Sequence, residues 1–230
     1  MNSLFALQPF TLAFVIGVYL SAVWFYRKTK LSLLHPVLTS ILVIIPVLKL
    51  LDVDYAAFEK GSFLIDFMLG PSVVAIGYSL YEQVSLVRKN IVSMLTAITV
   101  GSIVGIVSVA FIARLLGAEE IVVSSLEPKS VTTPIAVDIS ARFGGLPPLT
   151  AVVVVVTGVF GAVAGPLILD KTGVRNRIAR GLAMGSASHG GGTARALEMG
   201  AVEGAISGLS IGLMGVITAF MVPLLRALFG

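Results

Sequence analysis

The chain has 230 residues, of which 57% are hydrophobic and 12% charged, and its mean hydropathy is +1.01. A soluble domain of this size could not hide so much apolar surface from water, so the composition predicts an integral membrane protein. The absence of cysteine excludes disulfides and thiolate metal sites, and the +4 formal charge, carried by cations at the ends of apolar runs, favours cytoplasmic loops over a nucleic-acid-binding surface.

Six apolar runs predict about six transmembrane helices. They are residues 10–26, 37–51, 63–81, 91–113, 149–169 and 205–225. The fourth and fifth are free of charge and, at about 20 residues, long enough to cross a ~30 Å hydrocarbon core. The first has neither the basic start nor the cleavage site of a signal peptide, so we expect it to stay as an anchor. The third contains Asp66 and the break Gly70-Pro71, which predict a kinked or discontinuous helix.

The distribution of cations predicts the orientation. Arg27, Lys28 and Lys30 follow the first span and place that loop in the cytoplasm, which puts the N-terminus outside. If residues 121–146 crossed the membrane, a later basic cluster would lie outside, against this rule. That cluster consists of Lys171, Arg175, Arg177 and Arg180. We therefore expect residues 121–146 to dip into the membrane and return on the same side.

Two polar segments interrupt the apolar sequence, near residues 121–146 and 181–200. The first carries charges, hydroxyls and prolines, and the second is rich in glycine around a histidine. Non-helical backbone at membrane depth is tolerated only where protein covers it or water reaches it. The expected helix breaks are Pro128, Pro134, Gly190, Gly191 and Gly192. We expect two re-entrant elements that meet near the midplane, as in many secondary transporters.

Weak internal repeats also suggest a duplicated architecture, in either of two alignments. The first pairs Leu69, Pro71 and Gly101 with Leu126, Pro128 and Gly158. The second pairs Gly70 and Gly77 with Gly185 and Gly192. Both cannot be the main repeat.

Several motifs resemble the LrgB/CidB family over nearly the whole chain. They are Pro128-Lys129-Ser130-Val131-Thr132-Thr133-Pro134, Gly144-Gly145-Leu146-Pro147, Ala187-Ser188-His189 and Gly192-Thr193-Ala194-Arg195. The resemblance implies a bacterial multi-pass inner-membrane protein, often encoded beside a small holin-like (LrgA/CidA-type) partner and named for antiholin-like control of murein hydrolases. Plastid relatives carry glycolate and glycerate, and some bacterial members are linked to pyruvate uptake. The resemblance therefore also implies transport of small carboxylates.

Lys129 is the first candidate for binding a carboxylate. An intramembrane cation is costly enough that it usually faces a cavity or a partner, and the hydroxyls of Ser130, Thr132 and Thr133 lie beside it. Backbone N–H groups at a half-helix N-terminus would add to the attraction for an anion. The alternative is an ion pair with Glu127 or Asp138 that only fixes the loop.

His189 is the second candidate, because a pKa near 6.5 in water would let it couple transport to protons. Ser188 and Thr193 could contact substrate beside it, although a lone histidine is more often structural. Asp66 is either a proton or sodium carrier or the partner of a lysine on another helix. Arg195 and Glu198, three residues apart, are expected to pair with each other.

These observations predict one all-α, polytopic transmembrane domain over residues 1–230, with about six full spans and two re-entrant elements. Residues 1–60 would form a scaffold and residues 61–230 a transport core. The main hypothesis is an ion-coupled carrier of small 2-oxo or 2-hydroxy monocarboxylates that works by alternating access, with dimers favoured. The alternative is an antiholin-like structural regulator that acts by oligomerising in the membrane.

Enzymatic and cofactor-dependent activities are not expected. Ser188 and His189 are adjacent, and adjacent residues on a helix point about 100° apart, which argues against an intramembrane hydrolase that pairs them. The only histidines are His35 and His189, without metal-ligand spacing, and no phosphate-binding glycine loop is present. The expected partners are a small carboxylate, the lipid bilayer and a holin-like protein.

Overall fold

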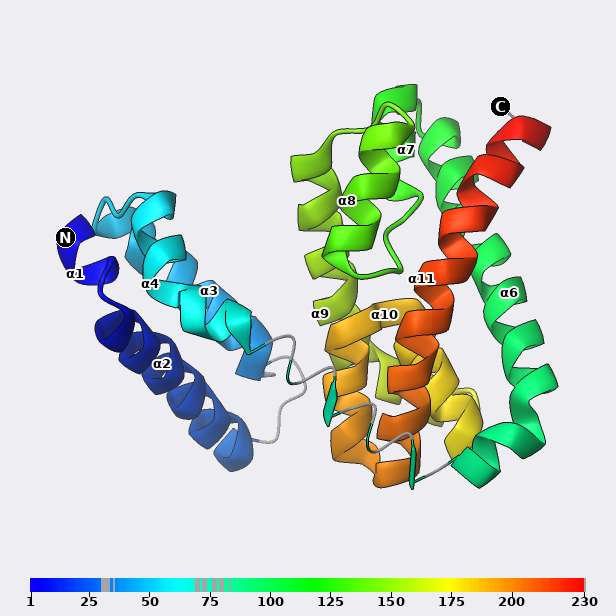
Figure 1. Cartoon of the computed structure of the whole chain (residues 1–230), viewed down its shortest axis with the longest axis horizontal. Helices are drawn as coiled ribbons and strands as arrows, with labels where there is room; N and C mark the ends of the chain where they lie inside the picture. The colour runs from blue at the N-terminus through cyan, green and yellow to red at the C-terminus, as the bar shows by residue number, and fades with distance from the viewer. Residues whose placement is uncertain are drawn as a thin grey trace. The chain divides into compact units, whose positions relative to one another are not determined.

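The computed structural model describes residues 1–29, 34, 36–68, 71, 74–75, 78, 81–82 and 84–229. All the regular elements in this part of the chain are helices (Figure 1), which confirms the all-α prediction. Gly70, Leu69, Gly77 and His35, which the sequence singled out, lie outside the described residues. The chain divides into two compact units, residues 1–75 and 76–230, and each is described by itself.

Unit 1 consists of α1 (Asn2–Phe5), α2 (Gln8–Thr29), α3 (Pro36–Leu50) and α4 (Tyr55–Phe67). Thr11 donates from Oγ1 to the carbonyl oxygen of Phe5 over 2.7 Å, and Gly61 of α4 packs directly against both residues. A side chain at Gly61 would collide with them, so this glycine lets α4 approach the start of α2. Asn2 Nδ2 donates to Asp54 Oδ2 over 2.7 Å and fixes the first residues to the start of α4.

Four described helices are long and apolar enough to cross a membrane: Gln8–Thr29, Val84–Leu115, Pro147–Lys171 and Ala201–Leu228. They contain four of the six predicted spans and make the protein a multi-pass membrane protein. α3 has 15 residues and is about 22 Å long, short of a ~30 Å core. α4 begins at Tyr55, before the third predicted run, and much of that run lies outside the described residues. A total of six spans stays a prediction.

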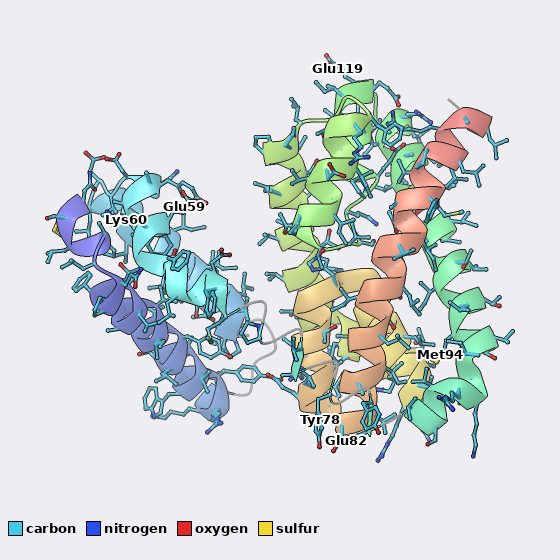
Figure 2. The ribbon with its side chains drawn as sticks, viewed as in Figure 1. Glu59, Lys60, Tyr78, Glu82, Met94 and Glu119 are labelled. Carbon is cyan, nitrogen blue, oxygen red and sulfur yellow. The ribbon has the colours of Figure 1, made fainter. Side chains whose placement is uncertain are left out.

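Unit 2 is built on three long helices, α6 (Val84–Leu115), α9 (Pro147–Lys171) and α11 (Ala201–Phe229). α6 and α11 run in one direction and α9 in the other (Figure 1). At one end of the unit α6 and α11 finish and α9 begins, and we call this the α7 end. The opposite end is the α10 end. Figure 2 shows Glu119 at the α7 end and Met94 of α6 toward the α10 end.

The first hairpin, residues 116–146, enters and leaves at the α7 end. It contains α7 (Glu120–Leu126), a turn, and α8 (Thr133–Arg142). α8 returns along α11, because Ile135 packs near Met214 and, nearer the end, Ile139 packs against Val222. At its end, the carbonyl oxygen of Phe143 accepts from Arg226 Nη1 over 3.1 Å. Residues 116–146 thus leave unit 2 at the end where they enter it, and the predicted dip of residues 121–146 into the membrane stays a prediction.

The second hairpin, residues 172–200, enters and leaves at the α10 end. α10 (Arg177–Met199) is interrupted at Ser188 (φ −137°, ψ 17°) and His189 (φ 37°, ψ −126°). Its first arm rises along α11, where Gly181 lies against Glu203 and Ile206. The second arm descends, with Thr193 Oγ1 2.7 Å from Ser207 Oγ, and Gly204 against Leu197. The two hairpins thus enter unit 2 from opposite ends (Figure 1).

Candidate functional site

The tips of the two hairpins approach the same residue of α9, Val154. Val131, at the tip of the first hairpin, packs with Val154 and Met214 in one buried cluster. His189, at the tip of the second, donates from Nε2 to the carbonyl oxygen of Val154 over 3.0 Å. Val131 is 1% exposed and His189 is 8% exposed, so protein encloses both tips. The candidate site lies where these tips meet α9.

Lys129 lies at the tip of the first hairpin, just before α8. Its side chain is half-buried, and Nζ donates to Ser130 Oγ over 3.4 Å. α8 begins after Thr132, whose side chain makes no capping hydrogen bond, and Pro134 occupies the first turn. The free N–H groups of a helix start carry a partial positive charge. A cation and a helix N-terminus thus lie together, and this arrangement attracts anions.

The two acids that could neutralise Lys129 are paired with arginines instead. Glu127 Oε2 accepts from Arg226 Nε over 2.7 Å, and Asp138 Oδ2 lies 3.0 Å from Arg142 Nη2. Within the described residues, no carboxylate lies at ion-pair distance from Lys129. The alternative that the sequence left open, an ion pair that only fixes the loop, is therefore absent from this part of the chain.

Arg226, in the last turns of α11, binds both arms of the first hairpin. Besides Glu127, its guanidinium donates to the carbonyl oxygen of Phe143 over 3.1 Å and to Ser124 Oγ. Nη2 also lies 3.4 Å from Glu120 Oε1. Glu127 is 5% exposed, and a buried carboxylate is stable only with such partners. Both residues, Arg226 and Glu127, line a groove of about 330 Å³, whose other walls are largely apolar residues of α6.

Arg114 completes the charge arrangement at the α7 end. Its Nη2 lies 2.9 Å from Glu120 Oε1, and this hydrogen bond lowers the pKa of Glu120 below its ordinary value. Both charges are well exposed, so their pairing contributes little to stability. Because Arg114 pairs with Glu120, Arg226 is the chief partner of the buried Glu127.

Glycines of α9 make room for the tip of the second hairpin. A Cβ at Gly158 would lie 2.7 Å from His189 Cε1, and one at Gly165 would lie 2.6 Å from Met184 Sδ. Gly161, between them, packs directly against Ser188. At spacings of three and four these glycines share one face of α9, and small residues let helices approach closely in membranes.

The helix break in the second hairpin precedes the residues that were expected to form it. The non-helical angles occur at Ser188 and His189, whereas Gly190, Gly191 and Gly192 belong to the returning arm. Gly191 faces the carbonyl oxygen of Gly158, and Gly192 faces that of Met184. Both glycines therefore serve close approach of backbones, while a Cβ at Gly190 would meet open space. In the first hairpin Pro134 starts α8 and does not break it, because proline fits the first turn of a helix.

The remaining candidates divide between the units. Ser130, Ser188 and Thr193 are buried in the hairpins of unit 2, and Thr132 and Thr133 are partly buried at the start of α8. Pro128 is buried in the turn before Lys129. Arg195 and Glu198 form an ion pair, as predicted.

Asp66 belongs to unit 1, where it lies in the last turn of α4 with an exposed side chain. It borders a groove of about 370 Å³ with residues of α2 and α3. Pro71 is described and exposed, but Gly70 beside it is outside the described residues. The expected break at Gly70-Pro71 and the coupling role of Asp66 both stay predictions.

Arg226 and the α9 glycines also contribute to the site, although they were not among the residues predicted for it. Arg226 stands near the end of an otherwise apolar run, and a charge in that setting is a signal for a buried partner. The spacing of Gly158, Gly161 and Gly165 was also visible as a face of small residues. Neither signal identifies the partner, which lies far away along the chain.

Comparison with known proteins places this architecture in a family. Residues 15–228 match the family model described as the LrgB-like family. The chain is 32% identical to "Antiholin-like protein LrgB" of Bacillus mycoides, over 100% of this chain and 98% of the relative. It is 31% identical to "Holin-like protein CidB" of Staphylococcus epidermidis, over 94% and 96%. It is 37% identical to a Bacillus subtilis protein, YxaC, over 93% of each. No solved structure matches.

Proposed function

Because the chain belongs to the LrgB-like family of membrane proteins, we propose that it is a multi-pass carrier of small monocarboxylates in the bacterial inner membrane. The substrates would be 2-oxo or 2-hydroxy acids such as pyruvate, glycolate or glycerate. The observation that carries this proposal is Lys129, a half-buried cation without an acidic partner among the described residues.

The chemistry around Lys129 suits a small carboxylate. The ammonium group would neutralise the carboxylate, and the free N–H groups at the start of α8 would hydrogen-bond its oxygens. The hydroxyls of Ser130, Thr132 and Thr133 could bind the 2-oxo or 2-hydroxy group. Ser188 and Thr193 would contribute from the second hairpin when the tips open around the substrate.

The two hairpins support an alternating-access mechanism. They enter from opposite ends of unit 2, and the tips of both contact Val154. Movement of one hairpin would therefore expose the site to one face of the membrane only. Discontinuous elements of this kind, in inverted arrangement around a midplane site, occur in many secondary transporters.

The coupling ion would act through His189 or Asp66. In the bond to Val154 the Nε2 atom of His189 holds a proton, which leaves Nδ1 as the position for a second one. Protonation would create a cation beside the site and so link anion binding to pH. Asp66 is the alternative carrier, in unit 1.

Charge supports a cytoplasmic α10 end. That end carries the cluster of Lys171, Arg175, Arg177 and Arg180, together with Arg88 and Lys89. The α7 end carries Glu119 and Glu120, and its arginines are matched by acids. The positive-inside rule then places the α7 end outside. By the same rule Arg27 and Lys28 place the N-terminus outside.

Uptake into proteoliposomes tests the proposal. Purified full-length protein should take up radiolabelled pyruvate or glycolate in a saturable way, and excess unlabelled carboxylate inside the vesicles should drive counterflow. Lys129→Gln should abolish saturable uptake, because the anion loses its counter-charge. Lys171→Gln, which removes an exposed lysine at the α10 end, is the control and should keep it. Full saturable uptake in Lys129→Gln would refute the site.

A second candidate function rests on the names of the relatives, which favour it over the first. "Antiholin-like protein LrgB" and "Holin-like protein CidB" describe proteins of a holin-like system. On this account the chain would oligomerise, as a dimer or a larger assembly, with itself or with a small holin-like (LrgA/CidA-type) partner, and would regulate murein hydrolases. A solute leak without saturation or preference among dyes and acids would favour this function over the carrier.

A further inference from the structure

We propose that the groove between α6 and α11 binds one zwitterionic phospholipid whose headgroup carries a primary ammonium group. One acyl chain lies along α6, the phosphate binds Arg114, and the ammonium group faces the acids at the start of α7. The inference goes beyond the carrier function, because it concerns the surface of unit 2 and involves neither Lys129 nor His189.

The groove is shaped for a hydrocarbon chain. Its volume is about 330 Å³, and its apolar walls are residues of α6 between Ile103 and Phe111, together with Leu225 of α11. Val107 and Phe111 are exposed on unit 2, and α6 is long and apolar enough to cross a membrane. Groove walls without neighbours lose van der Waals contacts. A flexible acyl chain from the bilayer restores these contacts.

The groove also has the length of one leaflet. From Ile103 to Arg114 α6 rises about 16 Å, at 1.5 Å per residue, and half of a ~30 Å hydrocarbon core is about 15 Å. The charged lining residues, Arg114, Arg226 and Glu127, lie at the α7 end, where α6 and α11 finish. Glu119 is exposed at the same end (Figure 2). A phospholipid with one chain along the apolar walls therefore has its phosphate beside the arginines.

Arg114 has donors left for a phosphate, whereas Arg226 is used by the protein. All three nitrogens of Arg226 donate to groups of the first hairpin. Arg114 binds Glu120 through Nε over 3.2 Å and through Nη2 over 2.9 Å. Its Nη1 makes no hydrogen bond within the part of the chain that the structure describes, and its side chain is 42% exposed. Charge-assisted hydrogen bonds from arginine to phosphate are among the strong ones in proteins.

The charges at this end of the groove favour a zwitterionic headgroup over an anionic one. Two arginines, Arg114 and Arg226, lie with three glutamates, Glu119, Glu120 and Glu127, which leaves a formal charge of −1. An anionic headgroup would add a like charge, whereas a zwitterionic one brings a cation to the exposed carboxylates of α7. A primary ammonium group also has N–H donors for a carboxylate, and a quaternary one has none.

Native mass spectrometry of the purified full-length protein tests the inference without transport. Phosphatidylethanolamine, phosphatidylcholine and phosphatidylglycerol with identical acyl chains are titrated in turn, so that only the headgroup differs. Arg114→Gln removes the phosphate ligand, and Val107→Trp places a large side chain between the apolar walls. Arg142→Gln is the control for the first, because it removes another exposed arginine at the α7 end. Val104→Trp is the control for the second, because Val104 is exposed on α6 but does not line the groove.

The native protein should bind one phosphatidylethanolamine molecule, and more tightly than either of the other lipids. Arg114→Gln should weaken this binding about fivefold, as expected for one charge-assisted hydrogen bond at a partly exposed site. Val107→Trp should weaken it about tenfold, because the acyl chain no longer fits between the walls. Both controls should bind as the native protein does. Because a ligand of the folded state raises Tm, phosphatidylethanolamine should stabilise the native protein and the controls more than the two groove variants.

Equal affinity of phosphatidylethanolamine for the native protein, Arg114→Gln and Val107→Trp would place the lipid elsewhere and overturn the inference. Equal or tighter binding of phosphatidylglycerol would also overturn it, because the headgroup would then be wrong. If no lipid is retained and Val107→Trp alone changes the oligomeric state in size-exclusion chromatography, the groove belongs to a second copy of the chain and the inference is wrong.

Val107→Phe, with Val104→Phe as its control, serves if Val107→Trp does not give a monodisperse peak, and a smaller loss of affinity is then expected. The lipid readouts are independent of uptake. The expected pattern of lipid binding in a protein that takes up no carboxylate would support the inference and refute only the carrier function.

Discussion

At the scale of single residues, the site depends on which charged side chains have a partner of opposite charge and which do not. Glu127 and Asp138 have arginine partners, whereas Lys129 has only the hydroxyl of Ser130 among the described residues. A half-buried cation in that state is unfavourable unless a ligand or water completes it. The pattern of pairing, more than the presence of a lysine, makes this position a candidate for binding an anion.

A glycine-to-alanine change at Gly158 tests the contact of α9 with His189. The added Cβ would lie 2.7 Å from His189 Cε1, so the imidazole must move. We expect a loss of about 1–3 kcal/mol in stability from overpacking, seen as a lower Tm in detergent. Gly101→Ala in α6 is the control, because a Cβ there meets nothing within 4 Å. Equal melting temperatures for the two variants would contradict the close packing.

The sequence predicted which residue types would matter here but not their partners. Lys129 and His189 stood out because polar residues are rare in membrane segments. The partner of Glu127 is Arg226, 99 residues away, and no local pattern reports such a distance. The choice between an ion pair and a free lysine therefore needed the fold.

At the scale of elements, the two hairpins are the defining feature of unit 2. Their paths follow from local chemistry. The polar turn before α8 starts a new helix at Thr132 and Pro134, and glycines on α9 and α10 let the second hairpin fold tightly. The first hairpin follows α6 and the second follows α9. Because α6 and α9 run in opposite directions (Figure 1), the two hairpins begin at opposite ends of unit 2.

Cysteine labelling tests the return of the first hairpin. The chain has no native cysteine, so single substitutions report one position each. Glu119→Cys and Arg142→Cys stand before and after the polar turn, at the same end of unit 2. We expect a membrane-impermeant maleimide to label both from the same side of intact spheroplasts. Labelling from opposite sides would mean that the segment crosses the membrane.

The positions of the hairpins could be predicted, but their internal geometry could not. The composition of residues 121–146 and 181–200 marked both as broken, and the basic cluster after α9 indicated that the first returns. The turn at Ser188 and His189 was placed too late, at the glycines, because glycine tolerates turns and close packing equally. Only the contacts of Gly191 and Gly192 in the structure show that these glycines serve close packing and do not form the turn.

At the scale of the whole molecule, the chain combines a smaller helical unit with a unit that carries both hairpins. Residues 1–75 hold the span α2 and the candidate Asp66, and residues 76–230 hold Lys129 and His189. The role of residues 1–60 as a scaffold, and of the rest as a transport core, stays a prediction. Four apolar helices and the family match define a multi-pass membrane protein.

The sidedness of unit 2 has its own test. Arg175→Cys lies between α9 and α10, at the α10 end, and Glu119→Cys at the α7 end. If the α10 end is cytoplasmic, the impermeant maleimide should label Arg175→Cys only after the membrane is opened, and Glu119→Cys without opening. The reverse pattern would place the basic cluster outside, against the positive-inside rule.

Equilibrium binding measures the central claim, an anion site at Lys129, most directly. Detergent-purified protein should bind radiolabelled pyruvate or glycolate saturably, and unlabelled acid should displace it. Lys129→Gln should weaken this binding about thirtyfold or more, as expected for loss of one partner of a buried charge pair, while Lys171→Gln should bind as the native protein does. Equal affinity in the native protein and Lys129→Gln, or no saturable binding of any short carboxylate, would contradict the account.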